Sequence, residues 1–136
     1  MLLTAILLGF LAGLRTFTAP AVLLLMRRGT PLAYALGVLA LAEYAADLSP
    51  KAPARTAPAG LIARACSGGF CGWTVMSLSG TSGAEGALAG AVAAVIGAYA
   101  GLAARSRAIG LIGRVPAGLL EDVIAAAASV AVVAYL

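Results

Sequence analysis

Residues 43–61 read Glu-Tyr-Ala-Ala-Asp-Leu-Ser-Pro-Lys-Ala-Pro-Ala-Arg-Thr-Ala-Pro-Ala-Gly-Leu, and they decide how the rest of the chain can fold. This stretch lies between two apolar runs and holds two of the five acidic residues of the chain, Glu43 and Asp47. Because these two are four positions apart, they share a face on a helix. Pro50 ends that helix, and Pro58 opens the next apolar run as a favoured first helical residue. The sequence therefore predicts paired carboxylates at the end of one hydrophobic helix, with basic residues in the connection that follows.

The composition is typical of a membrane protein. Of the 136 residues, 62% are hydrophobic and 10% are charged, whereas a soluble domain carries about 45–50% apolar and about 25% charged residues. A soluble fold of this length cannot bury so much apolar surface, so we expect the lipid bilayer to surround the chain. Residues 1–136 then form a single transmembrane domain, with room for four or five helical spans of about 20 residues each.

Charge and cysteine content exclude several function classes. The net charge of +4 does not indicate nucleic-acid binding, because the basic residues stand singly or in pairs at the ends of apolar runs. Cys66 and Cys71 lack a zinc-binding spacing and the chain has no histidine. On a helix the two cysteines are too far apart for a disulfide, so we expect buried free thiols. No nucleophile elbow, phosphate loop or metalloprotease motif is present, so we do not expect an enzyme.

The apolar runs predict an all-α bundle of about five transmembrane helices. They cover residues 2–26, 31–48, 58–79, 86–104 and 116–136. Between the last two runs, Arg105, Arg107 and Arg114 fall in a connection that contains glycine. Five Lys and Arg residues lie in the loops on one side of such a bundle and two on the other, which predicts a cytoplasmic N-terminus and an external C-terminus.

Two kinds of local repeat bear on packing. The third and fifth runs open with the same four residues, Pro58-Ala-Gly-Leu and Pro116-Ala-Gly-Leu. Counted from these prolines, Arg64 and Asp122 stand at equivalent positions. Two interpretations of this match stay open: a repeated two-helix unit, or chance in a chain so rich in alanine, glycine and leucine. Glycines also recur four residues apart, at Gly9/Gly13, Gly68/Gly72, Gly86/Gly90 and Gly97/Gly101. Such pairs let helix backbones approach closely, so we expect a compact bundle and, for so small a chain, a homodimer.

Ionisable residues inside the apolar runs are the candidate functional groups. Arg15 falls midway along the first run, where a charge costs at least about 2.5–3.5 kcal/mol on insertion scales. It is expected to face the interior as the partner of a carboxylate, or to act as a gate or an anion ligand. The candidate residues for binding a small solute or ion are Arg15, Glu43, Asp47, Arg64, Glu121 and Asp122.

Three interpretations of the carboxylates stay open. Carboxylates held away from water can bind and release a proton during transport. Their oxygens also suit a hard divalent cation such as Mg²⁺, Mn²⁺ or Ca²⁺, for which Glu43 and Asp47 would be the ligands. In the structural interpretation they pair with Arg55, Arg64 and Arg105 and only fix how the helices pack. No other cofactor is expected.

The order of the polar residues resembles a known family. The matching segments are Gly13-Leu-Arg15, Glu43-x-x-x-Asp47, Pro58-Ala-Gly and Glu121-Asp122-Val. Together they resemble the bacterial integral-membrane family catalogued as domain of unknown function four-one-two-six, over nearly the whole chain. That family usually has Lys directly after the second acidic residue, where this chain has Leu48. The resemblance implies a multi-pass fold in the bacterial inner membrane and brings no activity with it.

The residues themselves predict passage or exchange of a small solute or ion, as in a transporter or channel. Glu43 and Asp47 would be the coupling or cation-binding pair, and Arg15 their counter-charge. The alternative is a structural or accessory membrane protein whose buried charges only fix helix packing and oligomerisation.

Overall fold

The computed structural model describes residues 1–49, 51 and 56–136. Within these residues the chain forms helices and no strand, so the all-α prediction is confirmed. The helices are α1 (Leu2–Leu14), α2 (Thr18–Arg27), α3 (Pro31–Asp47), α4 (Pro58–Leu78), α5 (Gly83–Ile112) and α6 (Arg114–Ala134). Two residues named above, Pro50 and Arg55, lie outside the described part of the chain.

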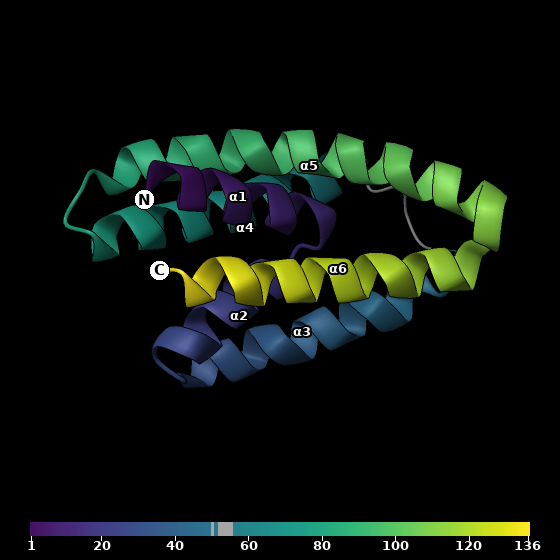
Figure 1. Ribbon diagram of the computed structural model, residues 1–136, viewed down its shortest axis with the longest axis horizontal. Coiled ribbons are helices and arrows are strands. Elements are labelled where there is room, and N and C mark those ends of the chain that lie inside the picture. The colour runs from purple at the N-terminus through teal and green to yellow at the C-terminus, as the bar shows by residue number, and fades with distance from the viewer. Residues whose placement is uncertain (50, 52–55) are drawn as a thin grey trace.

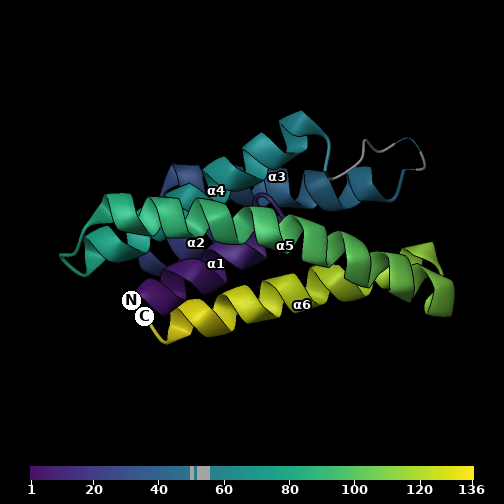
Figure 2. The same ribbon diagram turned by 90° about the horizontal axis from the view of Figure 1, so that it is seen from above.

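The first apolar run does not form one span. α1 ends at Leu14, Arg15 has an extended backbone with φ −138° and ψ 117°, and α2 begins at Thr18. In Figures 1 and 2, α1 runs from the N-terminus into the middle of the bundle, and α2 returns to the end that holds both termini. The predicted span over residues 2–26 is therefore wrong, and a pair of short helices that turns back inside the bundle takes its place.

Pro20 gives the physical reason for this break. In a continuous helix the carbonyl of Thr16 would accept a hydrogen bond from the N–H four residues on, but Pro20 has none. In the structure Pro20 lies in the first turn of α2, where N–H groups need no partner within the helix. The hydroxyl of Ser67 on α4 donates to the carbonyl of Thr16 instead. The hydroxyl from another helix thus satisfies the carbonyl that the proline leaves unpaired.

The helices α3 to α6 lie along the bundle and alternate in direction (Figure 1), and α5 is the longest of them. α3 begins with Pro31 in its first turn, after Thr30, whose hydroxyl accepts the N–H of Ala33 at 3.4 Å. α3 and α4 match the predicted runs to within one residue at each end. Proline at the start of an apolar run was therefore a reliable boundary for these two helices.

α5 and α6 differ from the prediction near the turn that joins them. α5 continues to Ile112, so Arg105 and Arg107 lie on a helix and not in a connection. The turn is made by Gly113, whose φ of 90° favours glycine. α6 therefore begins at Arg114, and its acidic pair lies about two turns inside the helix, whereas the sequence placed that pair near its start.

Glycine allows close contact between α4, α5 and α1. A Cβ atom on Gly72 would overlap the carbonyl oxygen of Gly86, and one on Gly68 would overlap that of Gly90. On α1, a Cβ atom on Gly9 would overlap the backbone of Gly90. These glycine pairs pack within one copy of the chain, so they no longer support the predicted homodimer.

Two described helices are long and apolar enough to cross a membrane, α5 with 30 residues and α6 with 21. The prediction of about five such helices is wrong. α1 and α2 have only 13 and 10 residues because of the break, and α3 has 17, whereas a full crossing takes about 20. α4 has 21 residues, but Arg64 and several serines and glycines make it less apolar.

Large apolar side chains are also exposed on the outside of the bundle. Val38 on α3, Leu88 on α5 and Val123 on α6 are 66%, 70% and 65% exposed. Such side chains favour an apolar surrounding. Together with the two long apolar helices, they indicate a membrane protein.

Candidate functional site

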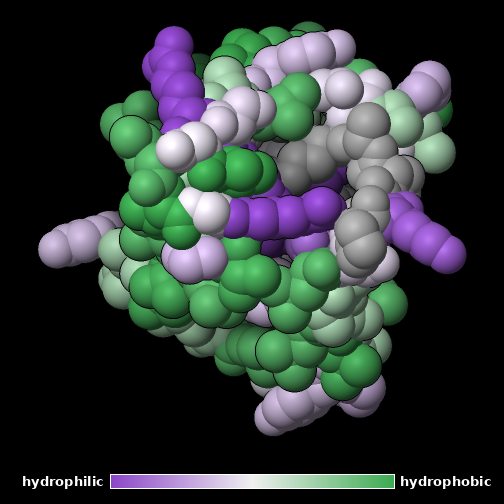
Figure 3. Space-filling model, turned by 90° about the vertical axis from the view of Figure 1, so that its right-hand side faces the viewer, coloured by the Kyte–Doolittle hydropathy of each residue, from purple (hydrophilic) through white to green (hydrophobic). Residues whose placement is uncertain are grey.

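Seven charged side chains of the described residues gather inside the bundle in two ion-paired groups. They are Arg15, Glu43, Asp47, Arg64, Arg105, Glu121 and Asp122, and we call them the charge cluster. Glu43 pairs with Arg64, and both hydrogen-bond to the backbone on either side of Arg15, which is at the centre of the other group. The cluster lies toward the end where α3 ends and α4 and α6 begin, opposite the termini. Figure 3 looks onto this end and shows hydrophilic residues in its middle with hydrophobic residues around them. All six predicted binding residues belong to the charge cluster, and Arg105 joins them.

Arg15 lies at the centre of the charge cluster and is 1% exposed. Its guanidinium forms ion pairs with Asp47 on α3 and Asp122 on α6. Its Nη2 lies 4.0 Å from Oε2 of Glu121, and its Cζ lies 5.2 Å from the centroid of the Tyr44 ring. Within the described residues Nε of Arg15 has no hydrogen-bond partner. The bend between α1 and α2 is what brings this arginine to the interior.

Asp47 joins two arginines through one oxygen atom. Its Oδ2 accepts a hydrogen bond from Nη1 of Arg15 and another, at 2.7 Å, from Nη1 of Arg105. Arg105 Nη1 also lies 3.5 Å from Oε2 of Glu121. The side chain of Asp47 is 21% exposed, against 12–14% for the other three carboxylates. Asp47 is therefore the carboxylate of the charge cluster that water or an ion reaches most easily.

Glu43 and Arg64 hydrogen-bond to the backbone groups at the two helix ends that meet at the bend. The carboxylate of Glu43 accepts the N–H of Thr16 at 3.0 Å and that of Phe17 at 3.2 Å, just before α2. Nε of Arg64 donates to the carbonyl of Gly13 at 3.1 Å, in the last turn of α1. Nη2 of Arg64 lies 3.8 Å from Oε1 of Glu43. A negative group thus meets a helix start and a positive group meets a helix end, as the helix dipoles favour.

The four-residue spacing correctly predicted that Glu43 and Asp47 face the interior, where arginines approach both. Two residues at the site were not among the predicted binding residues, although Arg105 was expected as a partner of the carboxylates in the structural interpretation. Arg105 was assigned to a connection, although it continues the register of Gly97 and Gly101 at four-residue steps, which places it on their buried face. Tyr44, whose hydroxyl lies 2.6 Å from Thr18 Oγ1, has no such signal in the sequence.

In this conformation the carboxylates of the charge cluster contact positive groups or backbone N–H groups. No group of three or more histidine, cysteine or acidic side chains among the described residues is arranged to hold a metal ion. Both oxygens of Glu43 accept backbone hydrogen bonds, so its coordination of a cation would require those bonds to break. The arrangement can exchange ion-pair partners, and Asp47, already shared between two arginines, is the carboxylate best placed to do so.

The cysteines lie outside the charge cluster. Both are free thiols, as predicted, but only Cys71 is buried and Cys66 is exposed.

No protein-family profile, no curated protein and no solved structure matches this chain. The resemblance to the bacterial membrane family therefore stays a prediction from the motifs alone.

Proposed function

We propose that the chain is a small multi-pass protein of the bacterial inner membrane that passes or exchanges a small ion or solute at the charge cluster. The observation that carries this proposal is the turn-back between α1 and α2, with extended backbone at Arg15 inside the bundle. Non-helical backbone at membrane depth is tolerated only inside protein or beside a wet cavity. Broken helices of this kind form the binding sites of many transporters.

The proposed placement differs from the predicted orientation. In the proposed placement α3 to α6 all cross the bilayer, although α3, with 17 residues, is at the lower limit for a crossing and α4 is less apolar than α5 and α6. The α1–α2 pair enters the bilayer halfway, which leaves both termini on one side (Figure 1). Lys51, Arg107 and Arg114 belong to the opposite end, whereas Arg27 and Arg28 lie at the end of the termini. The positive-inside rule then favours a cytoplasmic opposite end and external termini.

Asp47 is the proposed coupling residue, and Arg15 is its counter-charge. A proton or cation that reaches Asp47 from the cytoplasmic end would weaken its hold on Arg15 and Arg105. Arg15 would still contact Asp122, so it would not be left alone in a low-dielectric interior. Arg15 can then pair with Asp47 in one conformation and with Asp122 alone in the other. A transporter that opens alternately to the two sides of the membrane needs two such conformations.

A structural or accessory role is the second candidate. It is favoured by Glu43, whose two oxygens both serve the backbone at the start of α2. In this role the charge cluster only locks the bend in place. A homodimer is compatible with either role and stays a proposal.

Flux through reconstituted vesicles tests the first candidate. The purified protein is placed in vesicles that carry a pH-sensitive or cation-sensitive dye. Proton or cation flux into these vesicles should be faster than into empty vesicles, and Asp47→Asn should remove most of that flux. The matched control is Glu85→Gln, because Glu85 is an exposed acidic residue in the first turn of α5, at the other end of the bundle. If native protein, Asp47→Asn and Glu85→Gln all behave like empty vesicles, the structural role is the better account.

A further inference from the structure

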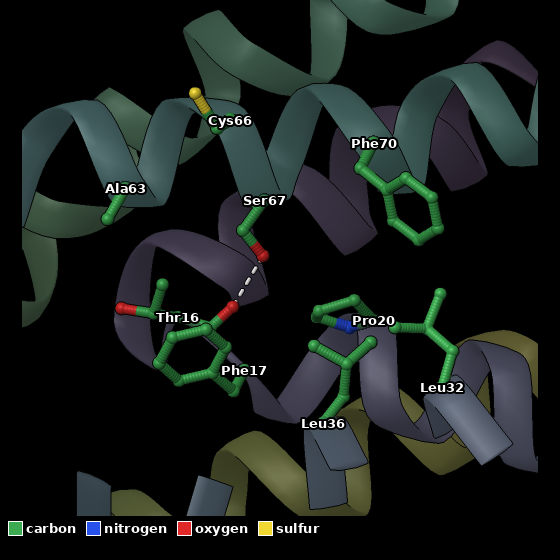
Figure 4. A pocket seen from close by; sticks show the side chains of 9 residues that line it. All are labelled: Thr16, Phe17, Pro20, Leu32, Leu36, Ala63, Cys66, Ser67 and Phe70. Atoms are coloured by element: carbon green, nitrogen blue, oxygen red, sulfur yellow. Dashed lines mark hydrogen bonds between the residues drawn. The ribbon is translucent and has the colours of Figure 1, made fainter. Parts of the chain in front are cut away.

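Two cavities adjoin on the face of the bundle that α2, α3 and α4 form. The first has a volume of about 370 Å³ and a mostly apolar lining that includes Pro20, Leu36 and Phe70. Figure 4 shows these three side chains projecting from three different helices into the space between them. The second has a volume of about 300 Å³ and is lined by Arg28 and Trp73, among others. Phe70 lines both cavities, so they lie next to each other, and we call the pair the groove.

The length of this groove matches one leaflet of a bilayer. Its inner end is at Thr16 and Phe17, at the bend, and its outer end is at Arg28, just after α2. α2 has 10 residues, which corresponds to about 15 Å of helix. The hydrocarbon core is about 30 Å thick, so one leaflet takes up about 15 Å of it.

The outer end of the groove has the chemistry of a phosphate site. Arg28 is exposed there and lines the cavity together with Trp73 and Ser77. The indole Nε1 and the hydroxyl of those two side chains lie close to Gly83 on α5, so the guanidinium of Arg28 is the group available to a phosphate. No carboxylate of the described residues lines either cavity. Arginine and tryptophan at the end of a membrane helix stand at the level of lipid headgroups.

We propose that this groove binds an anionic phospholipid. Arg28 binds the headgroup phosphate, and one acyl chain lies past Phe70 and Pro20 toward the bend. This proposal rests on the proposed function only in placing the bundle in a bilayer. It also explains why a basic pair stands at the end of the termini, against the positive-inside rule, because a lipid phosphate neutralises Arg28 there. The acyl chain would touch Phe17 and so support the backbone next to Arg15.

Lipid titration of the detergent-purified chain, followed by native mass spectrometry, tests the headgroup. Phosphatidylglycerol should bind more tightly than phosphatidylcholine with the same acyl chains. Arg28→Gln should weaken phosphatidylglycerol binding about tenfold, the effect of losing one charge-assisted hydrogen bond, whereas Arg28→Lys should keep most of it. Arg27→Gln is the matched control, because Arg27 is exposed and adjacent but lines neither cavity.

A second pair of variants tests the acyl chain. Leu36→Trp fills the groove and should weaken binding of long-chain phosphatidylglycerol. Leu39→Trp should not, because Leu39 is exposed on the same helix and lines neither cavity. Glycerol 3-phosphate, which has no acyl chain, should fail to displace the lipid.

Several results would overturn the lipid site. These are equal losses from Arg27→Gln and Arg28→Gln, equal binding of the two lipids, or displacement by glycerol 3-phosphate alone. A dimer that Leu36→Trp dissociates while phosphatidylglycerol fails to bind would assign the groove to a second copy of the chain. Flux through vesicles without lipid selectivity would contradict only the lipid site. Selective binding of phosphatidylglycerol without flux would contradict only the proposed transport function.

Discussion

Arg15 is nearly inaccessible, yet it carries a full charge and contacts carboxylates from α3 and α6. A buried ion pair is weak evidence for net stability, but breaking one by removing a single partner is costly. The residues of the charge cluster should therefore be tested in pairs, since single substitutions report the charge that is left behind.

Asp47→Asn should lower the free energy of unfolding, because Arg15 and Arg105 lose the carboxylate between them. Removing one partner of a buried pair costs about 3–5 kcal/mol, and the 21% exposure of Asp47 places the loss toward the low end. Adding Arg15→Gln should recover part of it. Thermal unfolding in detergent, followed by circular dichroism, measures the four proteins of this double-mutant cycle: the native chain, the two single variants and the double variant.

Glu85→Gln is again the control and should leave the melting temperature nearly unchanged, since Glu85 is exposed. A coupling energy between Asp47 and Arg15 below about 0.5 kcal/mol would mean that the two charges act independently.

Glu43 should behave differently, because its carboxylate serves the backbone. Glu43→Ala leaves the N–H groups of Thr16 and Phe17 without their acceptor, at about 1–3 kcal/mol each. Glu43→Gln keeps one acceptor oxygen and should cost less. Amide hydrogen exchange at Thr16 and Phe17 should rise more for Glu43→Ala than for Glu43→Gln; equal rates would contradict the capping role.

At the level of the helices, close packing of α4 on α5 depends on the absence of side chains. Gly72→Ala should destabilise the bundle by about 1–3 kcal/mol, the usual cost of overpacking, because its Cβ would overlap the carbonyl oxygen of Gly86. Denaturation in mixed micelles measures the change.

Gly37→Ala supplies the matched comparison for Gly72→Ala. A Cβ on Gly37 meets nothing within 4 Å, and alanine in a helix interior is favoured over glycine by roughly 0.5–1 kcal/mol. Gly37→Ala should therefore stabilise slightly. A similar loss of stability from both variants would show that close contact between helices is not the reason for glycine at position 72.

The helices that the sequence predicted well are those with local signals at their ends. Pro31 and Pro58 open α3 and α4, and the apolar run after each proline gave the length. The break at Arg15 was missed because hydropathy averages a few polar residues into their apolar surroundings. Its cause, the missing N–H of Pro20, is visible in the sequence, but the bend also needs Ser67, Glu43 and Arg64 from other helices.

The charge cluster was easier to predict than the helix that carries part of it. Every ionisable residue inside an apolar run must find a partner, so listing those residues recovered six of its members. The sequence predicts Arg105 as a possible partner of the carboxylates, but it places this residue in a connection because charged residues usually mark the end of a span. In α5 the helix continues through it to Ile112, and the charge is satisfied by Asp47.

At the level of the whole molecule, the turn-back of α1 and α2 fixes the relation between the termini. Both termini lie at the same end of the bundle (Figure 2), so they should be found on the same side of the membrane. The proposed placement, with α3 to α6 crossing and α1 and α2 turning back, gives an even number of full crossings. Reporters active only outside the cytoplasm, fused before Met1 or after Leu136, should both give signal. A reporter inserted beside Lys51 should be silent, and opposite results at the two termini would rule out this topology.

The turn-back also has a consequence for how the protein is made. α1 and α2 precede the other described helices along the chain, and at 13 and 10 residues each is too short to span the bilayer alone. The partners of Arg15 on α3 and α6 leave the ribosome after it, Asp122 long after. We therefore expect the N-terminal pair to wait at the membrane surface during synthesis and to enter the bilayer only when α6 has been inserted.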